Sequence, residues 1–440
     1  MGISFENDYI CNMVVSRVIT LLSALLLTEG FAAFAQEPSP GGAAEVQVDS
    51  SARLVHIVSG TVTDLQTGAP LEGVDVGAPE QGYYTVTNRD GGFILKSDRN
   101  FGRVTFSFVG YETKTLYPGD RGGREVRIAL KPVSNLLREA VVISGDPRGI
   151  MKEAVSKIRD NYPLSEGLAD CFYRETVQKR QRYITVSEAV TLMQKNGYNH
   201  GVWQDKVAVE EGRSLVSPRT GDTLSVKVTG GPVQAVSLDV VKNREILFDD
   251  LDLYRMEMLP AEMIDGRPHF AIHIEPGVSF CPYALYEGTV YIDQITLAFS
   301  RMELSLDMSD KDKATRMMLV KKPFRLRFIP RELSLTVSYS PDPEDGLMRL
   351  RYIRTRFRFA CDWRKRLFRT SYTAVNEMVV THWHEGQSAR LTRKEAFPGS
   401  ASLSDRIGLF DDPDFWKDYN IIEPSESLEN AIGRLKKAAK

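Results

Sequence analysis

Hydrophobic and polar residues alternate in short runs after an apolar N-terminal segment. The runs include "IVSGTVTD", "GGFILK", "RVTFSFVG" and "EVRIAL", and turn residues separate them. Alternation with a period of two predicts half-buried β-strands. The spacing of the runs between His56 and about Ile143 predicts a β-sandwich of roughly seven strands. Within it, "TNRDGGFIL" predicts a hairpin, because Asp90-Gly91 tolerates the positive φ of a tight turn.

The period of the pattern changes near residue 145. "GIMKEAVSKIRDNYP" places apolar residues on one helical face, with Asp146-Pro147 at the start and Pro163 at the end. Long alternating runs follow from Cys171 to about Gly386, among them "RYITVSEAVTLMQ" and "YEGTVYIDQITLAFSRMELSL". Short connections between long strands favour antiparallel pairing. One more helix is expected near "GPVQAVSLDVVKNREILF".

These patterns predict a mainly β fold with two folded domains. The first is the β-sandwich over residues 56–145. The second, over 146–440, is expected to be a larger antiparallel, curved β-sheet domain with a few flanking helices. Its last helix is expected at about 425–438, because apolar residues recur there at helical spacing and lysines lie at the C-terminal end.

The N-terminal segment has the pattern of a secretory signal. "RVITLLSALLL" is an apolar run after Arg17, and small residues precede a cleavage site after Ala35. We therefore expect a signal peptide over 1–35 and a flexible linker over 36–55, with Met1 or Met13 as the start. An uncleaved anchor helix is the alternative. No later apolar run is long enough to cross a membrane as a helix, so a periplasmic protein, peripheral to the outer membrane, is expected.

Composition narrows the function classes. The 56 basic and 58 acidic residues give a formal net charge of -2, which argues against a dedicated nucleic-acid binder. After the signal, the cysteines are Cys171, Cys281 and Cys361. This odd, sparse set allows at most one internal disulfide, whose pairing the sequence leaves open, and contains no CxxC metal spacing.

The first domain resembles a known family. "SGTVTDLQTGAPLEGVDV", "TVTNRDGGFIL" and "VTFSFVGYET" occur in order and are similar to the carboxypeptidase regulatory-like domain. The resemblance implies a transthyretin-like β-sandwich that is not itself catalytic. The "FVGYET" end is similar to the version at the front of TonB-dependent outer-membrane transporters and exported proteins of Bacteroidetes-type bacteria.

The rest of the chain resembles exported proteins of the same bacteria that carry this domain and have no assigned activity. The segments "IMKEAVSKIRDNYP", "LYEGTVYID" and "FWKDYNIIEPSESLENAI" carry this likeness. The "YEGTVYIDQITLAFSRMELS" hairpin is also similar to the curved sheet of lipoprotein-carrier proteins. These resemblances imply no particular chemistry.

Histidines offer one candidate metal site. His382, His384 and Glu385 contain the H-x-x-E spacing of zinc carboxypeptidases. Such an enzyme needs a third ligand, a histidine well downstream, and no histidine follows His384, which argues against that enzyme. A site assembled with His269 and His273 is the alternative metal hypothesis, and polar surface positions on strands are the alternative to any metal.

An arginine-rich strand offers a candidate surface for anions. "RLRYIRTRFRFACDWRKR" puts Arg349 and Arg351 in one phase, and Arg354, Arg356 and Arg358 in the other. A β-bulge near Tyr352 would align all five on one face. That face would suit anionic lipid headgroups or polysaccharide. The alternative is a solvent-facing strand whose arginines pair with neighbouring acids.

Other catalytic signatures are lacking. The sequence has no G-x-S-x-G nucleophile elbow and no phosphate-cradling loop of Walker type. We therefore expect a non-enzymatic binding or assembly protein of the bacterial envelope, with no cofactor and no catalytic residue assigned. Its expected partners are an outer-membrane transporter, an assembly protein or an envelope glycan. The alternatives are a hydrolase of envelope polysaccharide or peptide and a periplasmic lipid or lipoprotein carrier.

Overall fold

The structure is a computed structural model. It describes residues 56–119, 125–133, 145–222, 224, 226–228, 230–278, 280–364, 368–384, 390–399, 401–407 and 419–439. All of these belong to one compact unit, residues 49–440. The expected signal peptide (1–35), the expected linker (36–55) and Glu385 lie outside the described residues.

The N-terminal β-sandwich consists of two small sheets. One has the order β4-β1-β7, in which β1 and β7 are parallel, and in the other β3-β2-β5-β6 are neighbours. Alternate side chains of β1 point inward, and Val62, Phe93 and Phe106 are among the residues buried between the sheets. The predicted sandwich is therefore confirmed. The strands are β1 (His56–Asp64), β2 (Asp75–Ala78), β3 (Tyr83–Val86), β4 (Gly92–Ser97), β5 (Val104–Ser107), β6 (Lys114–Leu116) and β7 (Glu125–Leu130).

The predicted hairpin in this sandwich is wrong. The turn residues behave as expected, since Gly91 has φ 75° and the Asn88 side chain accepts hydrogen bonds from the backbone N–H of Asp90 and Gly92. However, β3 pairs with β2, and β4 pairs with β1 in the other sheet. The turn thus carries the chain from one sheet to the other, because turn chemistry fixes a local reversal but not the partner of each strand.

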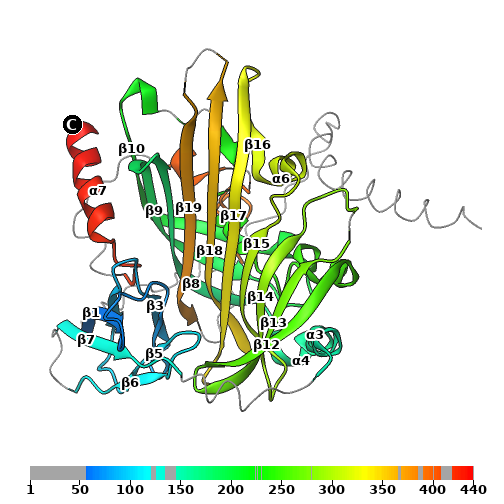
Figure 1. Cartoon of the computed structure of the whole chain (residues 1–440). Helices are drawn as coiled ribbons and strands as arrows, with labels where there is room; N and C mark the ends of the chain where they lie inside the picture. Colours follow the sequence, from blue (N-terminus) through cyan, green and yellow to red (C-terminus); the bar gives the residue numbers. More distant parts are fainter. Residues whose placement is uncertain are drawn as a thin grey trace, which may run out of the picture. The chain divides into compact units, whose positions relative to one another are not determined.

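The larger sheet is antiparallel and curled (Figure 1). Its ten long strands follow the order β12-β13-β14-β15-β17-β18-β19-β8-β9-β10, and a single residue pair, His382 with Tyr83, joins it to β3. This confirms the predicted antiparallel, curved sheet. The strands are β8 (Gly167–Lys179), β9 (Arg182–Lys195), β10 (Lys206–Val216), β12 (Tyr254–Ile264), β13 (Arg267–Pro276), β14 (Tyr286–Asp293), β15 (Phe299–Leu306), β17 (Leu326–Pro341), β18 (Met348–Trp363) and β19 (Thr370–His384). A separate pair is formed by β11 (Lys227–Val228) and β16 (Leu319–Lys321).

One face of this sheet is covered by helices and holds the main core. Met151, Val236 and Met318 come from three helices and belong to the same apolar cluster as alternate strand residues such as Tyr173 and Phe359. Asp146 caps the first helix as predicted, accepting from the N–H of Arg148 and Gly149. The helices are α3 (Pro147–Ser156), α4 (Ile158–Asn161), α5 (Pro232–Ser237) and α6 (Lys311–Met318), and the 3-10 turns are η2 (Val202–Gln204), η3 (Thr220–Asp222), η4 (Arg244–Ile246), η5 (Phe248–Leu253) and η6 (Leu403–Asp405).

The opposite face, here called the outer face, contacts the sandwich and the C-terminal helix. Val86 of β3 packs with Phe172, Tyr352 and Val379 of the sheet. Helix α7 (Glu426–Ala439) lies where the sequence predicts an amphipathic helix. Three of its apolar residues pack on Val186 of β9 and Leu215 of β10, namely Leu428, Ile432 and Leu435.

The three cysteines Cys171, Cys281 and Cys361 are buried and free. None of them forms a disulfide in the described part of the chain. Burial raises the pKa of the Cys361 thiol to about 11, which keeps it protonated and unreactive near neutral pH.

Candidate anion-binding groove

The arginine-rich segment forms β18, and the predicted bulge is present in it. Ser338 of β17 pairs with Tyr352, whereas the next residue, Tyr339, pairs with Leu350. Arg351 is therefore the extra residue on β18. The bulge reverses the side-chain phase, because Leu350 and Ile353 both face the main core while Tyr352 faces the outer side.

The structure does not bring all five predicted arginines into one site. Arg349 is held by Asp342 and Asp345 in the β17–β18 loop. The Arg351 guanidinium lies 3.4 Å from the ring centre of Tyr84 on the sandwich. These two arginines serve other contacts, and only Arg354, Arg356 and Arg358 share a surface depression.

That depression consists of two neighbouring cavities of about 1230 and 910 Å³ that share five lining residues. We call their joint surface the arginine groove. Its floor is the outer face of β18, β19 and β8, and its walls are α7, the β8–β9 turn and the turn after β3. Ten cationic side chains line it: Arg89, Arg174, Lys179, Arg180, Arg182, Arg331, Arg354, Arg356, Arg358 and Arg434.

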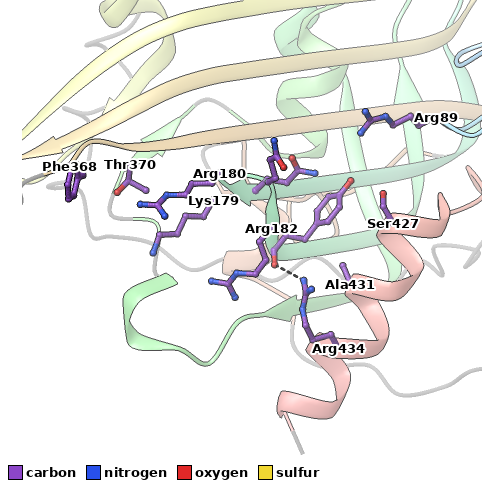
Figure 2. Close-up of a pocket in the computed structure, with 12 residues that line it drawn as sticks. Arg89, Lys179, Arg180, Arg182, Phe368, Thr370, Ser427, Ala431 and Arg434 are labelled. Carbon is purple, nitrogen blue, oxygen red and sulfur yellow. Dashed lines mark hydrogen bonds between the residues drawn. The ribbon is translucent and has the colours of Figure 1, made fainter.

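Figure 2 shows the larger cavity, where Arg89, Lys179, Arg180, Arg182 and Arg434 come from three separate segments of the chain. Arg434 of α7 donates to the backbone carbonyl oxygen of Tyr183 over 3.4 Å. This bond ties the helix wall to β9. The contributions from outside β18 were not predicted from the sequence, since only the fold brings them beside β18.

Acidic residues neutralise only part of this charge. Glu72 and Glu377 are the only carboxylates among the described lining residues, and both contact Arg354, Glu72 at 2.8 Å from Arg354 Nη2. Burial lowers the pKa of Arg354, but Tyr352 and these two carboxylates outweigh it and raise the pKa overall, so Arg354 stays charged. The lining therefore contains more cations than carboxylates, although Glu188 outside it pairs with Arg174 at 2.8 Å.

Other groove cations are paired outside the lining. Glu332 contacts both Arg356 and Arg358, at 3.8 and 3.2 Å. Asp222 pairs with Arg182 at 2.6 Å and with Lys179 at 3.4 Å. One carboxylate thus serves two cations at each of these places.

Three exposed arginines have no partner among the described residues. They are Arg89 in the turn after β3, Arg180 in the β8–β9 turn and Arg331 on β17. Arg180 has φ 59°, and its backbone N–H donates to the carbonyl of Ser371, which fixes the turn against β19. Free guanidinium groups around a groove can each donate two parallel hydrogen bonds to a carboxylate, sulfate or phosphate.

Aromatic and aliphatic side chains complete the lining. Tyr183 is half-buried beside the arginines and Phe368 is 77% exposed at one end, whereas the rings of Phe359 and Tyr372 are buried in the main core. Ile422 and Leu428 on the helix side are 2% and 4% exposed and pack in apolar clusters. Among the described lining residues, Tyr183 and Phe368 therefore supply the aromatic surface that a ligand can reach.

The rings of the candidate metal ligands His382 and His384 lie edge to face, with their centres 5.2 Å apart, and each ring also contacts another group. His382 bonds through Nδ1 to the Gly82 carbonyl at 3.1 Å and stacks on Tyr83 of the sandwich. His384 Nε2 lies 2.9 Å from Asp170 Oδ1. Burial lowers the pKa of His384, but Asp170 outweighs it and raises the pKa overall.

The alternative metal hypothesis used His269 and His273. His269 is buried and bonds to Ser300 Oγ and the Arg267 carbonyl. Among the described residues, no three His, Cys, Asp or Glu side chains are placed to hold a metal ion. The metal hypothesis for His382, His384 and Glu385 stays untested, because Glu385 lies outside the described residues.

The comparison with protein families concerns the sandwich. Residues 58–142 match the sequence model of the CarboxypepD_reg-like domain. The match spans β2 to β6 and most of β1, together with β7, and it confirms the predicted resemblance. A CarboxypepD_reg-like domain therefore supplies Glu72 and Arg89 to the arginine groove. No curated protein matches the chain significantly.

Solved structures give only distant likenesses. A LolA superfamily protein from Nitrosomonas europaea is 13% identical, covers 56% of this chain and 97% of its own, and has a TM-score of 0.23. A putative outer membrane lipoprotein-sorting protein domain from Vibrio parahaemolyticus is 11% identical, with 55% and 94% covered and a TM-score of 0.23. A DUF1329 family protein from Desulfovibrio piger is 12% identical, with 56% and 96% covered and a TM-score of 0.24. TM-scores this low carry no inference about function. Separately, none of the described helices is both long and apolar enough to span a bilayer.

Proposed function

We propose that this chain is a non-enzymatic binding protein that holds an anionic glycan in the arginine groove. The observation that carries the proposal is the set of three exposed arginines that have no partner among the described residues, around a groove whose described lining has ten cations and two carboxylates. Unpaired guanidinium groups gathered from β17, the β8–β9 turn and the sandwich are the natural partners of a multiply charged ligand.

The shape of the groove fits a flexible polymer better than it fits a flat membrane surface as the ligand. The floor of the groove is a sheet face recessed between α7 and the sandwich turn, which a planar bilayer could not reach without displacing these walls. The floor also presents side chains and no free strand edge, so an extended peptide would find no backbone partners of the β-augmentation kind. Arginines with the accessible rings of Tyr183 and Phe368 nearby suit acidic groups on sugar rings, whose apolar faces pack on aromatic side chains.

The two carboxylates of the groove support binding over hydrolysis. A glycosidase uses a pair of acids, one to protonate the leaving group and one to act as base or nucleophile. Here Glu72 and Glu377 both pair with Arg354, and Glu377 also accepts from the Tyr352 hydroxyl. The two carboxylates that line the groove are thus engaged with Arg354. The hydrolase alternative stays a prediction.

The lipid-carrier alternative also stays a prediction. A small cavity of about 130 Å³ lies on the helix-covered face of the sheet. Its lining includes Leu333, Ile353 and Phe357. Pockets that hold drug-sized ligands measure roughly 300–1,000 Å³. This cavity by itself is therefore too small to hold a ligand of that size.

The proposed location follows from the sequence. An exported protein would meet envelope glycans, which fits the expected signal peptide over 1–35. We also propose that the sandwich acts here as a wall of the groove, because Arg89 lines both cavities. Docking of the sandwich to an outer-membrane transporter remains a prediction from the resemblance.

The test compares two polymers that differ in charge alone, dextran sulfate and dextran, with polygalacturonate as a carboxylated probe. Calorimetry on the full chain should show binding of the two anionic polymers and not of dextran. Added salt should weaken the binding, because the contacts are charge–charge. Polygalacturonate binding without dextran sulfate binding would assign the groove to carboxylated glycans.

Variants locate the binding. Combining Arg89→Ser, Arg180→Gly and Arg331→Ser should weaken binding at least about tenfold, since each lost charged hydrogen bond is worth roughly 1.5–3 kcal/mol. Glycine suits the positive φ at residue 180. The control combines Arg103→Ser, Arg127→Ser and Arg255→Ser, which removes the same charge elsewhere on the surface. Equal losses in the two triple variants, or binding of neutral dextran, would overturn the proposal.

A further inference from the structure

A second cavity, of about 320 Å³, lies at the end of the large sheet where β8 and β18 begin and β9 and β19 end. It shares no lining residue with the arginine groove. The β17–β18 loop contributes Asp342 and Glu344, and the segment before β8 contributes Glu166. We call it the end pocket.

The back wall of the end pocket is a buried network of four charges. Lys195, which lines the pocket, lies 2.7 Å from Asp239 and 3.3 Å from Asp205. Lys242 lies 2.5 Å from Asp205, and the Tyr198 hydroxyl donates to Asp239. Lys195 and Asp239 are almost fully buried, so their geometry is fixed by partners on every side.

Two donors in the pocket lining have no acceptor in the described part of the protein. They are Trp383 Nε1 and Arg349 Nη1, and both atoms are buried. The other nitrogens of Arg349 are bound, Nε to Asp342 at 3.0 Å and Nη2 to Asp345 at 2.8 Å. The Arg349 guanidinium lies 5.8 Å from the Trp383 ring centre, so the two donors are close together. A buried N–H without a partner costs roughly 1–3 kcal/mol, which a ligand oxygen would recover.

The pocket also holds an unused acceptor. Glu166 is half-buried and has no hydrogen bond or ion pair among the described residues. His384 is fixed by its 2.9 Å contact with Asp170. Gly167 lets the tryptophan pack closely, since a Cβ there would lie 3.1 Å from the Trp383 ring.

The charges of the lining set the class of ligand. Lys195 and Arg349 face three carboxylates, Glu166, Asp342 and Glu344, so the pocket has no excess of positive charge. An anion is disfavoured, and a cation would leave the two orphan donors unsatisfied. A hydroxyl group donates and accepts at once, so a neutral ligand with several hydroxyls matches donors and acceptors together.

We propose that the end pocket binds a neutral sugar unit. A volume of about 320 Å³ fits a monosaccharide or disaccharide. The sugar oxygens would accept from Trp383 Nε1 and Arg349 Nη1, and a hydroxyl would donate to Glu166. This proposal rests on the end pocket alone and is independent of the arginine groove.

The experiment titrates the full chain with glucose, galactose, mannose, N-acetylglucosamine and maltose, with glucuronate as a charged analogue and glycine as a zwitterion. At least one neutral sugar should bind with a millimolar or lower dissociation constant, and glucuronate should bind more weakly than glucose. Trp383→Phe keeps the ring and removes the donor, and Glu166→Gln removes the charge. Each change should weaken binding of that sugar about five- to tenfold.

The controls are Trp203→Phe, on a residue that is 81% exposed, and Glu275→Gln on the surface of β13, neither of which should change the affinity. Trp383→Phe and Glu166→Gln must unfold at the parent's temperature for the comparison to count. Absence of binding by every neutral sugar would overturn the proposal, as would tighter binding of glucuronate or glycine. The sugar test and the dextran sulfate test concern different sites. If dextran sulfate does not bind the arginine groove, the expected binding of a neutral sugar in the end pocket is the same.

Discussion

At the scale of single residues, the buried network behind the end pocket makes a sharp prediction. Asp239 accepts from the hydroxyls of Tyr198 and Tyr339 and pairs with Lys195. Burial would raise the pKa of Asp239, but Lys195 outweighs it and lowers the pKa overall. The carboxylate is thus charged in the folded protein and is the counter-charge for a buried lysine.

Asp239→Asn should therefore destabilise the protein by about 3–5 kcal/mol in urea unfolding, because it leaves the two buried lysines Lys195 and Lys242 to share the single carboxylate of Asp205. The matched control is Asp252→Asn. Asp252 is 81% exposed and pairs with Arg148 and Lys152, so its loss should cost under about 1 kcal/mol. Similar losses in both variants would mean that the network is solvated in the folded state.

A second residue prediction concerns pH. Burial raises the pKa of Asp75 on β2 to about 7, although Arg301 and Arg351 oppose the shift. Between pH 3.8 and about 7, the folded protein thus holds a proton that the unfolded chain has lost. The stability contributed by Asp75 is present below pH 3.8, falls as the pH rises to about 7, and is constant above.

Asp75→Asn cannot titrate, so the variant should gain stability relative to the parent as the pH rises from about 4 to about 7. The expected gain is on the order of 2–4 kcal/mol, at 1.36 kcal/mol per pKa unit. Denaturant unfolding at several pH values measures it, with Asp252→Asn as the control that should follow the parent. A constant difference across this range would contradict the assigned pKa.

At the scale of elements, α7 links stability to binding. Leu435 is 3% exposed and packs with Val186 and Leu215 of the sheet, while Arg434 and Ala431 on the same helix line the arginine groove. The helix is therefore held by its apolar stripe and offers its neighbouring face to the ligand.

Leu435→Ala should cost about 2–4 kcal/mol in urea unfolding, because alanine leaves a cavity under the helix. It should also weaken binding of dextran sulfate, because the groove wall loosens. Asn430→Ala, at an exposed position of the same helix, should change neither quantity. If the Leu435→Ala protein is destabilised but binds dextran sulfate as tightly as the parent, α7 does not contribute to the binding site.

Elements also show what the sequence could and could not predict. Strands, the capped helix after Asp146 and the bulge in β18 follow from local patterns, and the structure has each of them. The prediction of a hairpin at Asp90-Gly91 is wrong, because β3 and β4 pair with strands of different sheets. Phase alone could not separate Arg349 and Arg351 from the other arginines, since Arg349 pairs with Asp342 in the adjoining loop and Arg351 contacts Tyr84 of the distant sandwich.

At the scale of the whole molecule, the sandwich and the sheet build one site together. Arg354 of β18 reaches Glu72 of the sandwich, and the Lys96 backbone N–H donates to Asn420 near the C-terminal helix. Arg89, Arg180 and Arg331 come from three separate segments, and their convergence depends on these contacts. No sequence pattern predicts that these three arginines lie around one groove, because each of them alone has the pattern of an ordinary surface residue.

The central claim is that a glycan lies on these three arginines, and arginine-selective labelling tests it directly. The full chain is treated with phenylglyoxal with and without polygalacturonate, and modification at each arginine is read by mass spectrometry. We predict that the ligand protects Arg89, Arg180 and Arg331 and leaves Arg127 and Arg255 unprotected. Equal labelling of the first three with and without ligand, under conditions where the ligand is bound, would contradict the account.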